Sequence, residues 1–497
     1  MNATEDVRVF LDTDRPEHYE LFLKLKRLPR VRFQGRTVLV PAEYAASLGM
    51  DASVPDVDYE PRPFLFDYQR DITRLAIRKR RFAVFADCGL GKSLILLEFA
   101  RHCASVLPAG RAILICSPLM VCRQTLAEAR RFYGDSLPLE QVPARELSTW
   151  LARGSGRIGI TNYEAITEGV RPGRLGSLIL DESSLLKSHY GKWGQRLIDI
   201  GAGLDWKLCL TGTPAPNDRI EYANHAVFLD REPTVNSFLA RYFVNRGQTD
   251  NRWELKPHAL APFYRSLSDW CIFLTDPATY GWKDNVASNM PPIHVHVHDV
   301  DLTEEQVALS VKAGGDMFGT PGGITSRAKL SQLAKGKHQG RKVDTNKPAF
   351  IRDLIATWPD ESTIVWTVYN DEQDTIEQAL PGAVGIRGDT PYEDRARIIE
   401  DFQAGRVRTL VTKAKVLGYG LNLQIATRQV FSGLVDSYEG YHQAVKRSNR
   451  IGSTRPLNVH IPVTAIERPM IETVLAKASR VQHDTEEQER IFQGVRV

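Results

Sequence analysis

The sequence has few cysteines and no long apolar run, and these absences exclude several classes of protein. Its six cysteines are scattered and form no C-x-x-C pair, which excludes a zinc ribbon, argues against a disulfide scaffold and fits a reducing compartment. No apolar run approaches the roughly 20 residues that a membrane-spanning helix needs. The N-terminus, MNATEDVRVF, carries acids instead of an apolar signal core. We therefore expect a cytoplasmic protein that is neither secreted nor inserted in a membrane.

Excess charge of one sign is also missing. The chain has 64 Lys+Arg against 60 Asp+Glu, a net charge of +4, which does not by itself identify a nucleic-acid-binding protein. Its 42% hydrophobic and 25% charged residues are typical of globular proteins. The length of 497 residues predicts about three domains. Any role in nucleic-acid binding must therefore rest on local patches.

Two long stretches alternate short β-branched runs with helical patterns. In the first stretch, runs such as 81–86, 112–116 and 177–181 predict buried strands separated by helices. The same alternation returns later in the chain, with predicted strands at 362–368 and 409–412. Strands that alternate with helices form parallel sheets, so the fold class predicted is α/β, with two lobes that each hold a parallel sheet flanked by helices.

Changes in composition divide the chain into segments. A proline-rich linker at 55–63 separates the beginning of the chain from the first lobe, and the stretch between the lobes is aromatic without strand alternation. Residues 313–345 are rich in Gly, Lys and Ser and indicate a connection or a small helical insertion. The predicted segments are a small N-terminal accessory domain (1–60), the first lobe (61–230), a helical insertion (231–290), the second lobe (291–480) and a C-terminal tail (481–497).

A glycine-rich segment between a predicted strand and a predicted helix has the pattern of a phosphate-binding loop. Backbone N–H groups and a helix N-terminus can surround a polyphosphate at such a turn. Lys92 would reach the β- and γ-phosphates, and the Ser93 hydroxyl would ligate Mg²⁺. A glycine-rich turn without a ligand is the alternative. The candidate residues for binding ATP in this loop are Gly89, Leu90, Gly91, Lys92 and Ser93.

Two carboxylates follow another predicted strand. Asp181 and Glu182 would lie at the carboxyl end of a parallel strand, where such sheets bind ligands. Asp181 suits a hold on Mg²⁺, and Glu182 suits orienting and deprotonating an attacking water. Alone, such a pair is usually a solvated turn. Gln69, ahead of the first strand, could read an adenine edge with its amide or could simply be solvated.

Arginines in the second lobe are candidates for stabilising charge during phosphoryl transfer. Arg447 and Arg450 are three residues apart, which would place them on one face of a short helix. Guanidinium groups stabilise charge on a transferring phosphoryl group, and a solvated basic helix is the alternative. In the first lobe, the hydroxyls of 211–213 could link the acidic pair to the interface between the lobes, and a plain turn is the alternative.

The order of these strings resembles the motif order of superfamily-two helicases, and within them the Swi/Snf family of double-stranded-DNA translocases. The lysine after the acidic box, Lys187, and the ending R-x-x-R-I-G are typical of that family. The resemblance covers residues 60–480. The strings are YQ (68–69), GLGKS (89–93), SPL (117–119), TNYE (161–164), DESSLLKS (181–188), LTGTP (210–214), GYGLNLQ (418–424) and QAVKRSNRIG (443–452).

This resemblance implies a DNA-dependent ATPase with two RecA-like lobes, ATP and Mg²⁺ as cofactors, and double-stranded DNA as the partner of a monomeric motor. It also implies roles for Gln443 in catalysis and for Gly420 and Asn422 in ATP binding. The alternatives are a strand-separating DNA or RNA helicase and a non-hydrolysing, ATP-switched DNA clamp. The residues implied to contact nucleic acid are Ser117, Pro118, Arg123, Thr161, Asn162, Lys187, Thr412 and Lys413.

Three features depart from the family pattern or extend it. The acidic box is DESS where relatives carry DEAH or DEGH, so the histidine that helps to relay between the ATP and DNA sites is missing. The insertions that members of this family carry in each lobe are short here, as in a minimal motor of phage type. Residues 24–36 hold six cations and no acid and resemble the HARP module, a DNA-binding accessory domain; a small packed cap is the alternative.

Three histidines alternate with valines in the stretch that opens the second lobe. His294, His296 and His298 would project from one face of a strand. The spacing of these histidines would suit a metal site. No carboxylate or cysteine partner lies nearby in the sequence, however, so a solvated strand face is expected.

Overall fold

The structure is a computed structural model, and the chain divides into two compact units. One unit comprises Met1–Asn285 and His483–Val497, and the other comprises Val286–Gln482. Among the described residues, no helix is both long and apolar enough to cross a bilayer. The structure describes residues 6–52, 56–154, 156–187, 192–247, 253–284, 290–312, 324–417, 423–434, 438–450 and 453–493.

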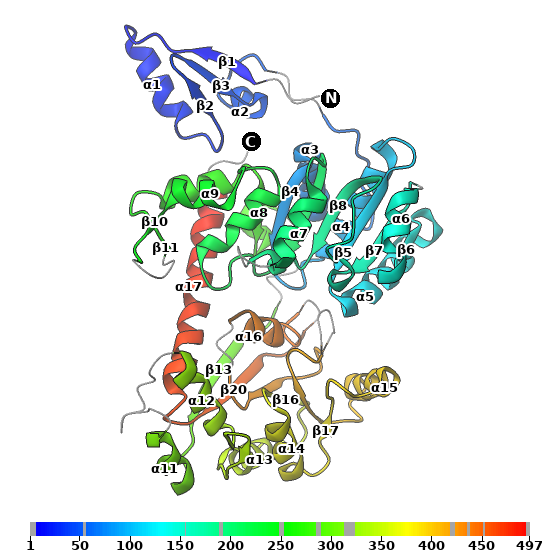
Figure 1. The fold of residues 1–497 in the computed structure, drawn as a ribbon, viewed down its shortest axis with the longest axis vertical. Coiled ribbons are helices and arrows are strands. Elements are labelled where there is room, and N and C mark those ends of the chain that lie inside the picture. The colour runs from blue at the N-terminus through cyan, green and yellow to red at the C-terminus, as the bar shows by residue number, and fades with distance from the viewer. Residues whose placement is uncertain are drawn as a thin grey trace. The chain divides into compact units, whose positions relative to one another are not determined.

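The first unit contains a seven-stranded sheet in the order β12-β4-β9-β8-β5-β7-β6, with every neighbouring pair parallel (Figure 1). The central strand β8 is buried along its whole length, as is typical of a strand covered on both faces. The strands are β4 (Arg81–Ala86), β5 (Ala112–Ser117), β6 (Leu139–Gln141), β7 (Ile158–Asn162), β8 (Leu175–Asp181), β9 (Trp206–Thr211) and β12 (Cys271–Leu274).

Helices pack on this sheet and position its strand ends. Helix α3 (Asp67–Lys79) contacts β4, α4 (Lys92–Val106) contacts β8 and β9, and α5 (Leu119–Tyr133) contacts β6 and β7. A single apolar core joins the sheet to a further set of helices. These helices are α6 (Leu147–Arg153), α7 (Lys192–Gly201), α8 (Tyr222–Phe228), α9 (Val235–Tyr242) and α10 (Leu260–Leu267).

The stretch expected to be a helical insertion differs from that expectation. Besides α9 and α10 it holds the hairpin of β10 (Phe243–Asn245) and β11 (Trp253–Leu255), and then β12. Strand β12 pairs with β4, so the end of this stretch completes the first sheet. A short, fully apolar strand shows no alternation, so its sequence cannot be told from a segment of buried helix.

The N-terminal segment forms a small module of its own. Strands β1 (Val7–Phe10), β3 (Thr37–Val40) and β2 (Arg32–Gln34) form an antiparallel sheet in that order, and the helices are α1 (Pro16–Leu25) and α2 (Ala42–Ser47). Its core includes the fully buried Leu25, Val38 and Val40. The module is therefore a packed unit with a core separate from that of the large sheet.

Polar contacts attach this module to the rest of the first unit. The hydroxyl of Tyr44 donates to Asp269 at 2.8 Å, and Lys79 Nζ donates to Glu43 at 2.6 Å. Burial opposes ionisation of Asp269, but Lys79 and Arg231 hold the pKa of its carboxyl well below the usual value. A buried carboxylate shared by two cations therefore stands where the module meets α3.

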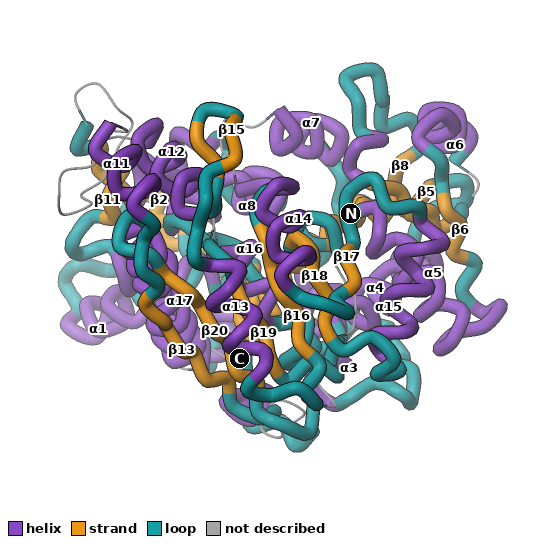
Figure 2. Tube along the Cα trace, turned by 90° about the horizontal axis from the view of Figure 1, so that it is seen from below, coloured by secondary structure: helices purple, strands orange, loops and turns teal. Residues whose placement is uncertain are grey.

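The second unit contains a six-stranded, fully parallel sheet in the order β13-β20-β19-β16-β18-β17 (Figure 2). The predicted fold class, α/β with two parallel sheets flanked by helices, is therefore confirmed. The strands are β13 (Ile293–Asp299), β16 (Thr363–Thr367), β17 (Val384–Gly385), β18 (Thr409–Lys413), β19 (Arg428–Phe431) and β20 (Leu457–Val463).

The two faces of this sheet carry separate apolar cores. On one face, Val365 packs with Ile351 of α13 (Lys347–Ala356) and Ile376 of α14 (Asn370–Ala379). The neighbouring Ile364 and Trp366 belong to the core of the other face. That face is covered by α15 (Tyr392–Gln403), α16 (Tyr438–Val445) and the start of α17 (Arg468–Gln493).

Short elements precede and follow this sheet. Helix α11 (Glu304–Lys312) follows β13, while α12 (Ile324–Ala334) and the hairpin of β14 (Lys337–His338) and β15 (Arg341–Lys342) follow later in the chain. The predicted connection at 313–345 thus contains a helix and a hairpin in its described part. The predicted C-terminal tail is helical up to Gln493, and Phe492 belongs to the core of the first unit.

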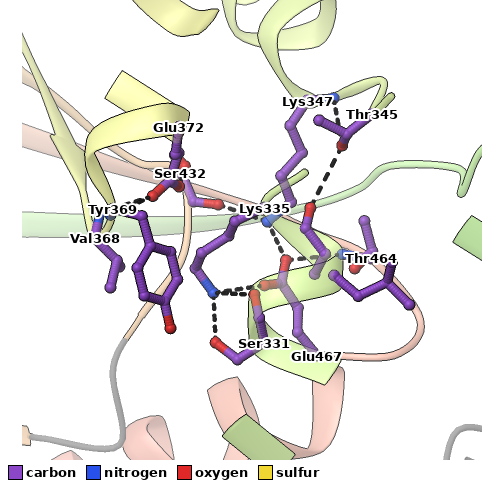
Figure 3. Close-up of polar contacts among 12 residues, drawn as sticks. Ser331, Lys335, Thr345, Lys347, Val368, Tyr369, Glu372, Ser432, Thr464 and Glu467 are labelled. Atoms are coloured by element: carbon purple, nitrogen blue, oxygen red, sulfur yellow. Dashed lines mark hydrogen bonds and ion pairs between the residues drawn. The ribbon is translucent and has the colours of Figure 1, made fainter. Parts of the chain in front are cut away.

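Two buried lysines share one carboxylate at the carboxyl end of the second sheet (Figure 3). Lys347 forms an ion pair with Glu467 and donates to the Ser432 carbonyl at 2.5 Å. Lys335 Nζ lies 3.2 Å from the same carboxylate and donates to the Ser331 hydroxyl at 2.8 Å. Burial opposes ionisation of Glu467, but the two lysines lower the pKa of its carboxyl. The network fastens α12, α13 and the start of α17 together.

A second carboxylate closes the same network (Figure 3). Glu372 accepts hydrogen bonds from the backbone N–H groups of Val368 and Tyr369, at 2.8 and 3.0 Å, and from the Ser432 hydroxyl. It therefore satisfies the amides of the turn between β16 and α14, and holds that turn to the end of β19.

The three predicted histidines of β13 do not form a uniformly solvated face. The rings of His296 and His298 stack on His460 of β20 with centroids 4.7 and 5.2 Å apart, and Trp358 also stacks on His460 at 4.6 Å. Burial, aided by the two imidazoles and Arg428, lowers the pKa of His460 to about 3. Parallel pairing of β13 with β20 places His460 opposite His296, which the local pattern could not reveal.

Replacing one buried lysine should destabilise the second unit. We expect Lys347→Met to lower the free energy of unfolding by about 3 kcal/mol, because it leaves Glu467 buried with half of its compensation. Arg352→Ala is the control on the same helix, since it removes only an exposed ion pair with Asp353 and should leave the stability nearly unchanged. Urea denaturation of both variants measures the difference; equal losses would contradict the prediction.

The histidine stack should make stability depend on pH. Between pH 6.5 and about 3 the unfolded chain protonates His460 more readily than the folded chain, so stability is full above pH 6.5 and is lost on acidification. From pH 7.5 to 5, we expect the free energy of unfolding to fall by about 2 kcal/mol more in the wild type than in His460→Leu. Guanidinium denaturation at both pH values provides the measurement. An equal fall in the free energy of unfolding of the two proteins would contradict the lowered pKa of His460.

Candidate functional site

The predicted phosphate loop lies between the end of β4 and the start of α4. Gly89 and Gly91 have φ of 91° and 68°, a region that glycine adopts without steric cost. Gly91 is also the N-cap of α4, and no side chain caps that helix. A methyl group on Gly91 would lie 2.2 Å from Gln69 Nε2. The backbone conformation therefore favours glycine here, and a side chain at this position would displace the Gln69 amide. The start of α4, which no side chain caps, faces the loop and suits an anion.

Lys92 and Gln69 both bond to this loop. Lys92 Nζ donates to the carbonyls of Ala86 and Asp87, at 2.8 and 3.2 Å. The buried Gln69 donates from Nε2 to the Leu90 carbonyl at 3.4 Å and accepts the Phe66 N–H at 3.0 Å. The glutamine predicted to read an adenine edge thus supports the loop itself in this structure. Ser93 is half-buried in the first turn of α4.

Asp181 ends the central strand β8 and is buried. It accepts hydrogen bonds from the Ser117 hydroxyl at 2.9 Å and from the Glu182 N–H at 3.1 Å. Burial and the neighbouring charge of Glu182 raise the pKa of Asp181 to about 7, while Ser117 and Lys92 oppose this rise. A cation would favour the ionised form, and carboxylate and hydroxyl oxygens are the ligands that Mg²⁺ prefers. The residues present therefore fit a Mg²⁺ ion.

Glu182 stands in a strained turn. Its φ of 52° is one of four positive values among the non-glycine residues that the structure describes. Such a conformation costs about 1–3 kcal/mol and persists only where its surroundings hold it. The Thr211 hydroxyl donates to the Glu182 carboxylate at 3.4 Å, and the Thr213 N–H donates to Thr211 Oγ1 at 3.2 Å. Of the 211–213 hydroxyls, that of Thr211 thus bonds to the acidic pair, while a link from there to the other lobe stays a prediction.

Contrary to the prediction from the sequence, the two arginines of the second unit do not lie on one face of a helix. Helix α16 ends at Val445, so Arg447 and Arg450 follow the helix instead of lying on one of its faces. Arg447 is buried, and its carbonyl accepts the Leu423 N–H at 3.0 Å. Gln443 lies on α16 and donates to Glu439 at 3.4 Å. Gly420 and Asn422 lie outside the described residues.

Three hydroxyls predicted to contact nucleic acid are buried. Ser117 donates to Asp181, as described above, while Thr161 donates to the Val142 carbonyl at 2.8 Å and Thr412 to the Ile386 carbonyl at 3.0 Å. Hydroxyls that satisfy buried carbonyls and carboxylates do not face solvent. We therefore leave these three side chains out of the proposed nucleic-acid surface.

The other predicted nucleic-acid contacts are more accessible. Arg123 is exposed on α5, Pro118 precedes that helix, and Asn162 and Lys413 are half-buried at the ends of β7 and β18. Lys413 donates to Asn370. The side chain of Lys187 lies outside the part that the structure describes.

Sequence reasoning missed the support that Tyr163 gives to the acidic pair. The buried Tyr163 hydroxyl donates to the Asp181 carbonyl at 2.6 Å. The available signal was its position after β7, in the string TNYE, because the carboxyl ends of β7, β5 and β8 lie at one edge of the sheet.

A glycine-rich loop after β4, an acidic pair at the end of β8 and two parallel sheets are the arrangement expected of a helicase-like phosphate-loop protein. Residues 82–347 match the SNF2-related domain, and residues 346–452 match the helicase conserved C-terminal domain. The chain belongs to the SNF2-related family.

Individual relatives are distant. The DNA annealing helicase and endonuclease ZRANB3 of Mus musculus is 22% identical over 442 residues, which cover 82% of this chain and 40% of ZRANB3. Protein p41 of Acyrthosiphon pisum secondary endosymbiont phage 1 is 22% identical over 440 residues, which cover 81% of this chain and 92% of p41. The chain thus spans about two fifths of ZRANB3 and nearly all of p41. It also spans 43% of another relative, YwqA of Bacillus subtilis.

Among solved structures, the Sulfolobus solfataricus SWI2/SNF2 ATPase core in complex with dsDNA resembles this chain. The sequence identity is 19% and the TM-score is 0.40, covering 89% of this chain and 98% of that one.

Proposed function

We propose that this protein is an ATP-dependent translocase on double-stranded DNA that remodels DNA or protein–DNA complexes. The observation that carries the proposal is the placement of the predicted phosphate loop beside the acidic pair: β4 and β8 are parallel strands of one sheet, so the loop that follows β4 and the pair at the end of β8 lie at the same edge of it. The charge of Lys92 accordingly opposes the rise in the pKa of Asp181. Family membership supports the assignment to helicase-like motors.

Each candidate site residue of the first unit has surroundings that fit its proposed role. The amides of the loop and Lys92 would bind the phosphates, and Ser93 with Asp181 would hold Mg²⁺. Mg²⁺ would neutralise charge on the β- and γ-phosphates. Glu182 would orient a water and accept its proton, with Thr211 fixing the carboxylate. The burial of Asp181 favours the reaction, because charges interact more strongly where water is scarce.

In the second unit, we assign Arg447 and Arg450 to stabilising charge on the transferring phosphoryl group, and Gln443 to the same reaction. The basis is the resemblance of 443–452 to the last helicase motif. Nucleic acid would be held through its phosphate backbone, by accessible residues such as Arg123 and Lys413, because backbone contacts position a motor without reading sequence.

The N-terminal module offers a further nucleic-acid surface. Tyr19 and Phe33 are exposed, and both pack against Phe22, with ring centroids 6.4 and 5.5 Å away. Lys26 lies over the Phe22 ring at 5.2 Å, and residues 24–36 contribute six cations. Aromatic side chains beside cations are typical of surfaces that bind nucleic acid. We propose that this face of the module is an accessory DNA-binding surface.

A four-way ATPase assay tests the motor. We expect hydrolysis to be stimulated by duplex DNA more than by single-stranded DNA or RNA. Lys92→Ala should lower turnover at least about 100-fold, because it removes charge stabilisation from the transferred phosphoryl group. Arg450→Ala should lower turnover while leaving ATP affinity nearly unchanged.

Arg352→Ala, an exposed substitution on α13, is the control and should keep the wild-type rate. Strongest stimulation by single strands, together with unwinding, would favour a strand-separating helicase. Binding of ATP without turnover would favour an ATP-switched clamp, and a rate unchanged by any nucleic acid would refute the translocase.

The accessory surface makes a separate prediction. Phe33→Ala should weaken binding of single-stranded DNA by about three- to tenfold, because unpaired bases stack on an exposed ring while the adjoining cations hold the phosphates. Phe10→Ala is the matched control: Phe10 is also exposed on the module, but its register with Thr37 and Gln34 places it on the opposite face of the small sheet from Phe33. Fluorescence anisotropy in increasing salt measures both variants, and equal affinities would contradict the proposal.

A further inference from the structure

The acidic box contacts a histidine from a distant helix. Nε2 of His225, on α8, lies 3.1 Å from the hydroxyl of Ser183, the residue directly after Glu182. Both side chains are fully buried. The next residue back on α8, Asn224, donates to the Leu186 carbonyl at 2.6 Å. Helix α8 therefore bonds twice to the short segment that follows Glu182.

A buried histidine is a costly choice at this position. The backbone of Glu221, which directly precedes α8, and that of Ser183 both stabilise the protonated ring of His225. Burial lowers the pKa of His225 to about 4, so the ring is neutral near pH 7. The ring meets Phe85 edge to face, with centroids 5.3 Å apart. A leucine of similar size could fill these surroundings but could not bond to the buried Ser183 hydroxyl, so packing alone does not account for the imidazole.

The hydrogen bond stands on the carboxyl side of the strained residue. On the amino side, Tyr163 and the Asp181 carboxylate already bond to the backbone around Asp181 and Glu182. Glu182 itself has a positive φ. A strained turn persists where bonds on both sides hold it, and the contact between Ser183 and His225 supplies such a bond on the second side.

We propose that His225 is a positioning residue for ATP hydrolysis, which holds Ser183 and thereby keeps the Glu182 carboxylate turned toward the phosphate loop. Ser183 and His225 act as a pair. The acidic box itself, DESS, lacks the histidine of the DEAH and DEGH boxes. The inference rests on the proposed role of Glu182 in activating water.

The experiment combines kinetics with amide exchange. Ser183→Ala and His225→Leu should each lower kcat about five- to tenfold, with KM for ATP within twofold of wild type, because the carboxylate is misplaced and the phosphate loop is intact. The double variant should lose no more than either single variant. His225→Gln should restore most of the rate, since its terminal amide can bond to Ser183 in place of Nε2.

Hydrogen–deuterium exchange of the ATP-free protein gives a readout that does not need turnover. Amides of 182–186 should exchange faster in Ser183→Ala and His225→Leu, at an unchanged melting temperature. His102→Leu is the control, because His102 is also buried in the first unit, where it packs on Tyr59 and Trp206. It should alter neither exchange in this segment nor kcat.

The two levels of the proposal fail differently. A wild-type protein without ATPase activity would refute the proposed function, while the exchange data would still decide whether His225 holds the turn. Unchanged exchange and kcat in both single variants, or an equal loss of kcat in His102→Leu, would overturn the inference.

Discussion

The burial of one carboxylate at the end of the central strand constrains the first unit. Asp181 is buried, and its ionisation is opposed by burial and by Glu182. Such a group needs donors from more than one direction, and the structure supplies the Ser117 hydroxyl from β5 and the positive charge of Lys92 from the start of α4. The hydroxyl donor and the positive charge meet at Asp181 because β4, β5 and β8 are parallel and end at one edge of the sheet. The position of the catalytic candidates is thus a consequence of strand order.

Hydroxyl residues at strand ends mainly bond within the protein. Ser117, Thr161, Thr412 and Ser432 each donate to a buried carbonyl or carboxylate. Where parallel strands end, carbonyl groups lose their partners in the sheet and need other donors. These side chains therefore stabilise the loops in which they lie. The contacts to nucleic acid that we propose fall instead on more accessible neighbours such as Asn162 and Lys413.

Buried charge also connects segments that are distant in sequence. Asp269 forms ion pairs with Lys79 and Arg231 where the N-terminal module attaches. Glu467 forms ion pairs with two lysines at the end of the second sheet. In both places one carboxylate is shared by two cations. Removal of a single cation leaves the carboxylate partly uncompensated, so each group favours one arrangement of its segments. The apolar cores on the faces of the sheets do not provide such directional contacts.

The sequence by itself determined the class of fold and the places of the glycine-rich loop and the acidic pair, because each depends on a local pattern: buried strands such as 81–86, glycines between strand and helix, and carboxylates after a strand. Only the tertiary structure decided that β12 completes the first sheet, that His460 lies against the histidines of β13, and that His225 meets Ser183. Sheet order and helix packing bring together residues far apart in the chain, and no local pattern of hydrophobicity records which of them will meet. The same limit applies to Arg447 and Arg450, since the end of α16 at Val445 depends on tertiary contacts as well as on local propensity.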